Sequence, residues 1–444
     1  MSSDLLNIAA TGVRAARAAL DVSSQNIANA ATTGYVRRSV QLSELAGASG
    51  FGYNGSLSLN GVRVAGITRN VDAFRQFEAR RTGSDVARAE TELSAYQNAE
   101  SALETAQLYP ALTGFEDSLQ RLTADPVSPS LRANVIESAR TLTRTFAIAA
   151  QGLDAVRDGL HVSAAAGTDQ VNQLAQQLAR VNVQLQRTQP GTDQVALLDQ
   201  RDSLLKDLSA LTDITATFGT NQSVDVRIGG AAGPQLVSGD AATPLALITA
   251  ADGTISFTLG GAAVAPAAGS LAGQAQGLIM VRDTHTQLDA VANSLIAAAN
   301  AAQATGTAFD GSTGQPLFSG SGAAGIALAL NSGAGLATAP AGASAGSRDP
   351  ANLTALRSAL AGADVPGQAG AMLFGISSAT QGRKLTSDAL GTIASAAKLA
   401  LDNQAGVNLD DEAVNLVRYQ QAFQASSKAI QIASDLFDTL LAIR

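Results

Sequence analysis

The stretch LVRYQQAFQASSKAIQIASDLFDTL (residues 416–440) repeats a large apolar residue at every seventh position. These residues are Leu416, Phe423, Ile430 and Phe437, with Tyr419, Ser426, Ala433 and Leu440 three residues after each. The stretch LNIAATGVRAARAALDVSSQNI (residues 6–27) has the same period, with Leu6, Val13, Leu20 and Ile27 followed by Ala9, Ala16, Ser23 and Ala30. Such a heptad pattern is typical of helices that pack along a seam, although ordinary amphipathic helices share its period. It predicts a long helix at each end of the chain.

Both seams are narrow, because small residues hold half of the positions in the N-terminal seam and two of the eight in the C-terminal seam. Burying four large apolar side chains contributes roughly 1.5–3 kcal/mol each. Ordering a helix of about 28 residues costs roughly 1–2 kcal/mol per residue, and its hydrogen bonds recover only part of that. We therefore expect the two ends to become ordered on assembly, against each other or against neighbouring subunits.

The composition favours closely packed helices over an enzyme with a thick core. The 444 residues are 46% hydrophobic but only 4% aromatic, and much of the hydrophobic share is Ala. A net charge of −8 and a pI of about 4.9 argue against nucleic acid as a partner. The lack of Cys in the sequence excludes disulfides and thiolate chemistry. We see no signal-peptide pattern at the N-terminus and no run that predicts a membrane span.

Helical spacing fills most of the interior. It predicts helices at about 72–107, 130–160, 278–295 and 369–403. It also predicts a helical hairpin whose two arms are 171–185 and 197–211. Alternating residues interrupt it from Ile214, with strands expected at 224–228 and 255–259 and a turn at Asp252-Gly253. Near the N-terminal end, SLSLNGVRV (residues 56–64) places Asn60-Gly61 between two alternating runs. This predicts a β-hairpin with a two-residue turn, in which Leu59 faces Val62 and Leu57 faces Val64.

The predicted fold is mainly α with a small β insert. Paired terminal coiled-coil helices, 1–34 and 404–444, form an axial domain. A discontinuous helical-bundle domain covers 35–213 and 271–403 and carries the β-hairpin near 57–64. A small β-domain covers 214–270. The Gly/Ala-rich segment 311–350 has no predicted role.

Several motifs carry a family resemblance. Ser24-Gln25-Asn26-Ile27-Ala28-Asn29, followed by Thr33-Gly34-Tyr35, resembles the N-terminal motif of bacterial flagellar rod, hook and hook-associated proteins. Three further stretches resemble the hook-associated protein 1 family: Gly61–Val64 with Arg69, Asp72 and Phe74; Leu197–Asp202; and Gly406–Glu412 before Leu416. The ending Leu436–Leu441 is similar too. We take as motif residues Asn26, Ile27, Asn29, Gly34, Tyr35, Leu198, Asp199, Arg201, Asp202 and Asn408. The short segment 311–350 departs from the family, whose members often carry outer domains there.

The resemblance implies a non-enzymatic structural adaptor that joins hook to filament at the hook–filament junction. It implies a homo-oligomer in a helical array, with the hook protein and hook-associated protein 3 as neighbours. It further implies an extracellular place in the flagellum, export without a cleaved signal peptide, and a flagellar export chaperone bound at the C-terminal helix. The expected assembly seam consists of Leu6, Val13, Leu20, Ile27, Leu416, Tyr419, Phe423, Ile430, Phe437 and Leu440.

Two other functions are compatible with parts of the sequence. A distal rod or hook axial subunit would share the ends of the chain, but not the long helical middle or the stretch Leu197–Asp202. A secreted enzyme or effector would need a convergent set of catalytic residues. Neither alternative fits the sequence as well as the junction adaptor does.

No residue pattern in the sequence predicts catalysis, a cofactor or a metal. The run Gly320–Gly325 has the spacing of a dinucleotide fingerprint, but an amphipathic helix does not follow it. His285 lies on an apolar stripe, which favours a packed, hydrogen-bonded core histidine over a catalytic base. Asp410, Asp411 and Glu412 are placed to cap the last helix. Asp199, Arg201 and Asp202 fit a solvated face, a buried ion pair or a catalytic acid, and the ion pair is favoured. Arg37-Arg38 fits exposed or subunit-facing charges.

Overall fold

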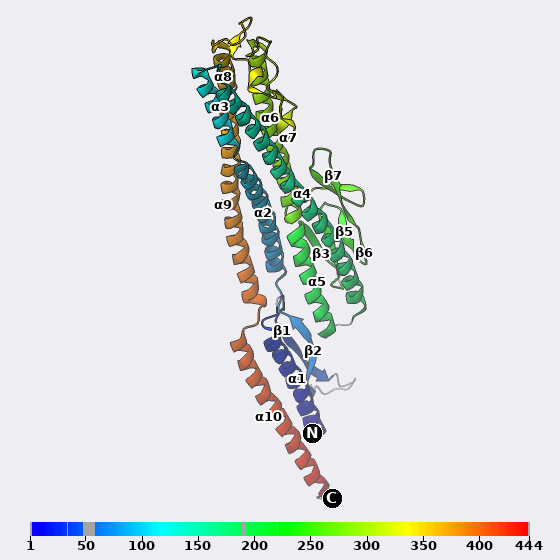
Figure 1. The fold of residues 1–444 in the computed structure, drawn as a ribbon. Coiled ribbons are helices and arrows are strands. Elements are labelled where there is room, and N and C mark those ends of the chain that lie inside the picture. Colours follow the sequence, from blue (N-terminus) through cyan, green and yellow to red (C-terminus); the bar gives the residue numbers. More distant parts are fainter. Residues whose placement is uncertain (1, 33, 48–57, 189–191, 220, 443–444) are drawn as a thin grey trace. The chain divides into compact units, whose positions relative to one another are not determined.

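The computed structural model describes residues 2–32, 34–47, 58–188, 192–219 and 221–442 (Figure 1). Its helices are α1 (Ser2–Asn29), α2 (Ala73–Ala106), α3 (Leu108–Ala124), α4 (Pro129–Arg187), α5 (Thr192–Leu211), α6 (Ser270–Ala304), α7 (Gly322–Gly325), η1 (Gly333–Gly335), α8 (Ala351–Ala363), α9 (Val365–Ala405) and α10 (Leu409–Ala442). Its strands are β1 (Arg38–Gly47), β2 (Ser58–Arg69), β3 (Ile214–Phe218), β4 (Val224–Ile228), β5 (Gln235–Ser238), β6 (Ala241–Ala242), β7 (Leu245–Thr249), β8 (Ile255–Leu259), β9 (Ala262–Val264), β10 (Gly306–Thr307), β11 (Phe318–Ser319), β12 (Ala327–Leu328) and β13 (Ala339–Pro340).

The chain divides into two compact units. The terminal unit holds Met1–Ser84, Val171–Pro244 and Gly391–Arg444, and the central unit holds Asp85–Gln170 and Leu245–Leu390. Long helices and small antiparallel sheets make up both units, which confirms the predicted fold class. The segment 214–270 forms two sheets, with β3–β6 in the terminal unit and β7–β9 in the central unit. The finer division into three domains stays a prediction. None of the described helices is long and apolar enough to cross a membrane.

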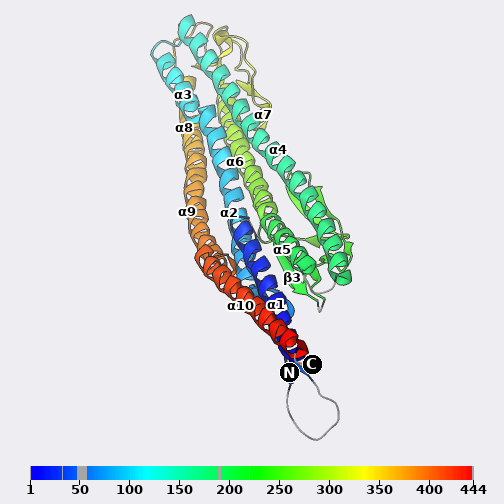
Figure 2. The same ribbon diagram turned by 90° about the horizontal axis from the view of Figure 1, so that it is seen from below.

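Helices α1 and α10 of the terminal unit lie side by side in both views (Figures 1 and 2). The face of α1 that packs is made of small residues, among them Ala15, Ala16 and Ala19, all buried. A Cβ atom at Gly12 would lie 2.9 Å from Ser426 Oγ of α10. The two terminal helices therefore approach closely, as a seam of small residues permits.

Strands β1 and β2 form a two-stranded antiparallel sheet beside α1. The predicted turn at Asn60-Gly61 is wrong, because both residues lie inside β2, where the register shifts between Leu59 and Val62. Val62 pairs with Glu44 and Val64 with Leu42, while Leu57 lies outside the described residues.

Gly61 is required here for a different reason from the one expected. Its φ is +96°, and a Cβ there would collide with Thr11 Oγ1 and lie 3.2 Å from Ile8 Cα. Glycine is therefore required at this position for two reasons: the backbone is left-handed, and α1 approaches too closely for a Cβ atom. The Asn-Gly pair marks a bulge in a strand instead of a hairpin turn.

The sheet β3–β6 of the terminal unit is held by a buried asparagine. Val224, Val226 and Ile228 of β4 are fully buried, as the alternation predicts. Asn182 of α4 donates through Nδ2 to the carbonyls of Val224 (2.8 Å) and Gly239 (2.7 Å), and its Oδ1 accepts from the Val224 N–H (2.9 Å). One polar side chain thus satisfies backbone groups of β4 and of the β5–β6 turn.

The core of the central unit lies among α2, α3, α4, α6, α8 and α9. Phe115 of α3 and Phe318 of β11 pack edge to face, with ring centroids 5.9 Å apart, and Phe146 of α4 is fully buried nearby in the same cluster. The helical segments expected at 130–160 and 171–185 are parts of one helix of 59 residues, α4. The intervening residues contain no proline, so nothing in the backbone ends the helix there.

The Gly/Ala-rich segment is tied to α6 through its backbone. Asn300 Oδ1 accepts from the N–H groups of Leu317 (2.8 Å) and Phe318 (3.0 Å), and Gln303 Oε1 accepts from the Ala337 N–H (2.9 Å). These side chains satisfy backbone N–H groups of the segment in addition to its two short antiparallel sheets.

At the start of α7, two backbone N–H groups of the glycine run already have acceptors within the protein. The Ala323 N–H donates to Asp289 Oδ1 (2.7 Å) and the Gly322 N–H to Asn293 Oδ1 (2.9 Å). A carboxylate and an amide oxygen of α6 therefore occupy the donors that a phosphate would need.

Candidate functional site

The motif after the first helix is organised by a buried asparagine in the terminal unit. Asn26 is 1% exposed, and its Oδ1 accepts from Tyr35 Oη (2.9 Å) and the Arg38 N–H (3.0 Å). Its Nδ2 donates to the Arg38 carbonyl (2.8 Å) and to Glu412 Oε1 (3.2 Å). Gly34 precedes Tyr35 with a φ of +82°, which favours glycine. The motif thus folds the chain back against the end of α1 and links it to α10.

Glu412, in the first turn of α10, is the acceptor at the centre of this link. It is 2% exposed, and it accepts from Ser23 Oγ (2.6 Å) through Oε2 and from Arg37 Nε (2.7 Å) through Oε1. Asp410, Asp411 and Glu412 lie in the first turn of α10, at the positive end of the helix dipole as expected. The side-chain cap is Asn408, which accepts from the Asp410 N–H (3.0 Å), while the Glu412 carboxylate bonds to α1 and Arg37 instead.

A second cluster forms around two carboxylates on α5. Asp199 pairs with Arg38 (2.8 Å) and with Arg69 (2.8 Å). Asp202 pairs with Arg69 (2.7 Å) and Arg201 (2.7 Å). The five side chains are 6–18% exposed, so the buried ion pair is the arrangement that forms. Arg38 is correspondingly not the exposed charge that the sequence suggested.

Further contacts extend this cluster to neighbouring elements. Gln76 Nε2 of α2 donates to Asp202 Oδ2 (3.0 Å). Arg201 Nη1 donates to the Gln222 carbonyl (2.8 Å), and its guanidinium lies 4.6 Å from the ring centre of Phe218. Helix α5 is thereby joined to α2, β2 and the β3–β4 connection.

Burial and neighbouring charges shift the pKa values of two residues in these clusters. Burial by itself would raise the pKa of Asp202, but the Arg201 and Arg69 guanidinium groups outweigh it and hold that pKa below its usual range. Burial raises the pKa of Tyr35, against the opposing charge of Arg38. Each carboxylate in the two clusters pairs with at least one guanidinium group, which is the arrangement of a structural ion-pair network.

The structure brings most of the expected motif residues together. Arg38 connects the two groups of motif residues: its N–H donates to Asn26, which also binds Tyr35 after Gly34, and its side chain donates to Asp199. Asp199 lies in the same cluster as Arg201 and Asp202. Asn408 caps the α10 turn that carries Glu412. Asn29 donates to the Gln25 carbonyl within α1, while Ile27 and Leu198 are half-buried packing residues. Ser23, Arg37, Arg38 and Gln76 were not expected to take part, because only the fold shows their partners.

The expected assembly seam is only partly covered in the terminal unit. Its half-buried members are Leu6, Val13, Leu20, Ile27, Leu416, Tyr419, Phe423 and Ile430. Phe437 is 48% exposed, and the Leu440 side chain lies outside the described residues. The seam assignment itself stays a prediction.

Helix α10 also carries exposed aliphatic residues near both of its ends. Val414 and Val417 near its start are 68% and 51% exposed, and Ile432 and Leu436 near its end are 53% and 51% exposed. Each pair is apolar area that a neighbouring molecule could cover.

The two histidines belong to the central unit. His285 Nε2 lies 3.2 Å from Asp154 Oδ1, with 21% of the side chain exposed, so it is hydrogen-bonded but not buried in the core as expected. His161 lies beside Arg157, Asp158 and the β7–β8 turn. Within the described ranges, no group of three or more His, Cys, Asp or Glu residues could hold a metal ion.

Comparisons with known proteins agree with the motifs. The chain matches the family model described as flagellar hook-associated protein FlgK helical domain over residues 93–318, about half of its length. It also matches the model described as flagellar basal body rod FlgEFG protein C-terminal over residues 402–443.

Curated relatives named flagellar hook-associated protein 1 are similar as well. That of Escherichia coli (strain K12) is 30% identical over 251 residues, which are 55% of this chain and 45% of the relative. That of Salmonella typhimurium is 28% identical over 335 residues, 71% of this chain and 59% of the relative. The matches thus span about half of each relative.

A solved structure, that of the flagellar hook junction protein FlgK from Burkholderia pseudomallei, matches with a TM-score of 0.48 and 24% identity. The match covers 54% of this chain and 46% of that one. From the first family match, the chain belongs to the flagellar hook-associated protein FlgK helical-domain family.

Proposed function

We propose that this chain is a structural adaptor subunit of the bacterial flagellum, which assembles at the hook–filament junction and joins the hook to the filament without enzymatic activity. Family membership and the names of the relatives support this role. The observation that carries the proposal is that the terminal helices leave apolar side chains exposed to solvent. The large seam residues of α1 are only half-buried, and α10 has exposed aliphatic residues.

These uncovered side chains support a homo-oligomer in a helical array. The two exposed pairs on α10, Val414 with Val417 and Ile432 with Leu436, leave the α1–α10 pair with further apolar surface to bury. Each of these side chains contributes about 1.5–3 kcal/mol when it is fully buried. Contacts between different surfaces of successive copies produce a helical array.

The proposed partners follow from this position. The hook protein and hook-associated protein 3 would lie on the two sides of the junction. A flagellar export chaperone would hold α10 before assembly, because apolar side chains of that helix are exposed. The proposed place is extracellular, within the flagellum, after export without a cleaved signal peptide.

Immunogold electron microscopy of isolated flagella tests the function. An antibody against the β3–β9 segment should label a narrow band where hook meets filament. Label along the rod or the whole hook would favour the alternative, a distal rod or hook axial subunit, which the match of residues 402–443 to the rod-protein model also suits. Label absent from flagella, with the protein in the medium, would favour a secreted effector.

Substitution on α10 tests the seam. Phe423→Asp or Ile430→Asp should abolish junction assembly, because each places a charge on the half-buried face of α10. The exposed change Gln424→Asp on the same helix should leave assembly intact. Normal filaments in the Phe423 and Ile430 variants, with both proteins exported, would contradict the seam assignment.

A further inference from the structure

The start of α2, in the terminal unit, presents two phenylalanine side chains to solvent. Phe74 and Phe77 are 71% and 48% exposed. Arg80 lies three residues after Phe77 and is half-buried. Residues three apart are neighbours on the surface of a helix, so these side chains form one continuous patch. This α2 surface, made of Phe74, Phe77 and Arg80, is apolar with a cation at one end.

The Arg80 guanidinium lacks an anionic partner. Among the described residues, its side chain forms no hydrogen bond and no ion pair. The carboxylate of Asp202, whose charge acts on it, pairs with Arg69 and Arg201 instead. Burial lowers the pKa of Arg80, against the opposing charge of Asp202. A partly buried guanidinium is stable when a carboxylate accepts its hydrogen bonds, so we expect a partner from outside the chain.

The C-terminal part of α10, also in the terminal unit, presents the opposite charge between two apolar residues. Ile432 and Leu436 are 53% and 51% exposed, and Asp435 between them is exposed as well. Their spacings of three and four residues place them on one face of the helix. Within the described part of the chain Asp435 forms no ion pair, and the like-charged Asp438 lies three residues away. This α10 surface, made of Ile432, Asp435 and Leu436, therefore carries an uncompensated anion.

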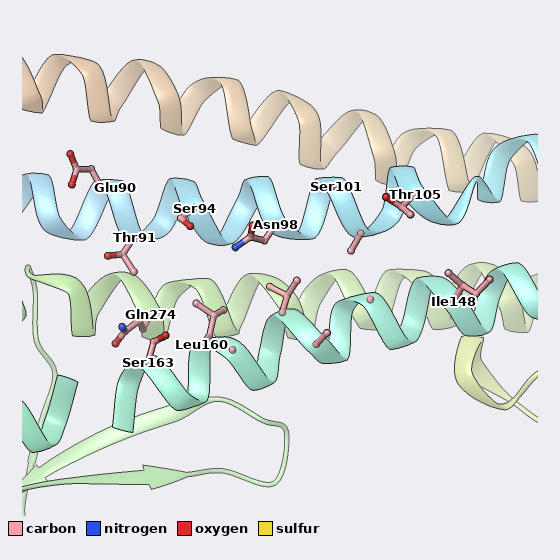
Figure 3. Close-up of a pocket in the computed structure, with 15 residues that line it drawn as sticks. Glu90, Thr91, Ser94, Asn98, Ser101, Thr105, Ile148, Leu160, Ser163 and Gln274 are labelled. Carbon is pink, nitrogen blue, oxygen red and sulfur yellow. The ribbon is translucent and has the colours of Figure 1, made fainter. Parts of the chain in front are cut away.

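Other exposed carboxylates match the α2 surface less well. Glu90 lies beside Thr91 at one end of the hollow between α2 and α4 in the central unit, whereas the exposed Ile148 lies at the other end (Figure 3). The hollow thus separates its carboxylate from its exposed apolar side chain. Asp410 and Asp411 lie in the first turn of α10, where the positive end of the helix dipole already stabilises their charge.

The order of the residues determines how the two surfaces fit. Residues 73–84 contain three Arg and one Glu, a net charge of +2, whereas residues 429–442 contain two Asp and no Lys or Arg, a net charge of −2. Phe77 precedes Arg80 by three residues, as Ile432 precedes Asp435. In a parallel arrangement with Arg80 level with Asp435, Phe77 is therefore level with Ile432, in the next layer. An antiparallel arrangement would place Phe77 level with Asp438 instead.

We propose that the α2 surface of one copy binds the α10 surface of a second copy, with the two helices parallel, Arg80 paired with Asp435, and Phe77 packed against Ile432. The contact joins two different surfaces and therefore continues from copy to copy. It deepens the proposed helical array, on which it rests, by naming a contact between successive copies.

Cysteine crosslinking in isolated flagella tests the contact directly, because the sequence contains no Cys. Cells make two full-length single-cysteine variants together, and a short bismaleimide is added to their flagella. The matched pair is Phe77→Cys with Ile432→Cys. The control pair is Phe77→Cys with Val417→Cys, a residue of α10 that is 51% exposed. The matched pair should give about tenfold more mixed crosslink, identified by peptide mass spectrometry, because docking raises the effective concentration of the thiols.

Charge exchange tests which carboxylate is used. Arg80→Glu and Asp435→Arg, made separately, should each lower the share of exported protein recovered in flagella about tenfold, because like charges then meet. Both changes together restore opposite charges and should return that share to within about twofold of wild type. Arg80→Glu with Glu44→Arg is the matched control, since Glu44 of β1 is an exposed carboxylate two residues from the exposed Leu42. Circular dichroism checks folding, and the crosslinks decide the question if Arg80→Glu does not fold.

Equal crosslink yields from the matched and control pairs would overturn the proposal. Recovery that Glu44→Arg restores and Asp435→Arg does not, in folded and exported proteins, would overturn the α10 surface as the occupant. Immunogold label at the junction together with equal yields would remove this contact and leave the proposed function standing. A tenfold matched yield with label along the rod or hook would support the contact and remove the proposed position.

Discussion

Glu412 and Asp202 show how single charged residues connect segments that are far apart in sequence. Glu412 of α10 accepts from Ser23 and Arg37, which lie 389 and 375 residues earlier. Asp202 of α5 pairs with Arg69, 133 residues earlier. Each carboxylate is buried against several donors, so its contribution depends on all of them being present.

Removing the Glu412 carboxylate should destabilise the terminal unit. Glu412→Ala removes the carboxylate partner of Arg37 and one acceptor each of the buried Ser23 and Asn26 side chains, and the expected loss is about 3 kcal/mol of the free energy of unfolding. Chemical denaturation followed by circular dichroism measures it. Asp435→Ala, an exposed change on the same helix, is the control and should change little. Equal losses in both variants would show that the buried contacts contribute nothing specific.

The contribution of Asp202 should depend on pH. Because its folded pKa lies below the ordinary value of 3.8, the stabilisation is fully present above that value and is lost as pH falls through the folded pKa. Wild type should therefore exceed Asp202→Asn in stability at pH 7, with the gap narrowing below pH 3.8. Urea denaturation over a pH series measures the gap. Asp207→Asn, exposed on the same helix, should show no such trend, and a constant gap for Asp202→Asn would contradict the ion-pair account.

Among the elements, the Gly/Ala-rich segment shows most clearly how polar side chains can order a chain with little apolar content. Arg132 of α4 is 3% exposed and donates to the carbonyls of Pro126 (2.6 Å), Gly333 (3.0 Å) and Leu336 (2.8 Å) and to Thr338 Oγ1 (2.5 Å). Burial lowers the pKa of its guanidinium. Several neutral acceptors thus take the place of a carboxylate partner.

Loss of Arg132 should loosen this segment while the bundle helices stay folded. Arg132→Met leaves buried carbonyls unsatisfied, at roughly 1–3 kcal/mol, so amide exchange in residues 333–338 should accelerate by about 5–150-fold. Arg140→Met, on the exposed part of the same helix, is the matched control. Unchanged exchange at the Ala337 N–H in the Arg132 variant would contradict the anchoring role.

At the scale of the whole molecule, the central unit buries a continuous core, although Phe374 and Leu385 of α9 are exposed, and the terminal unit leaves large apolar side chains of α10 partly uncovered. Leu103, Leu142 and Leu153 of the central unit are at most 1% exposed, in contrast to Phe437 and Leu436 of α10, which are about half exposed. The ends of the chain therefore have apolar area left to bury on assembly.

Amide exchange should separate the two units in the isolated chain. Because α1 and α10 have fewer buried contacts, their amides should exchange faster than those of α4 and α6 in the central unit, and should slow on assembly. Mass spectrometry of the free chain and of isolated flagella measures both states. Equal protection of the ends and the middle in the free chain would contradict ordering on assembly.

The sequence alone predicted the helical class, the terminal helices and the strands at 224–228 and 255–259, because these depend on local apolar periodicity. It also located the motif residues from Asn26 to Asn408 and favoured an ion pair for Asp199 and Asp202. The single helix α4 was missed, since a change in the apolar face reads as a break in the period.

Only the tertiary structure decided which donors meet which carboxylates. Arg37, Arg38 and Glu412 look like surface or capping charges in the sequence, and become buried partners because α1, α5 and α10 converge. Asn60-Gly61 likewise has the local signature of a turn, yet the approach of α1 places it inside a strand. Local periodicity is set by neighbouring residues, whereas ion pairs and close backbone approaches are set by segments hundreds of residues apart, which only the folded chain brings together.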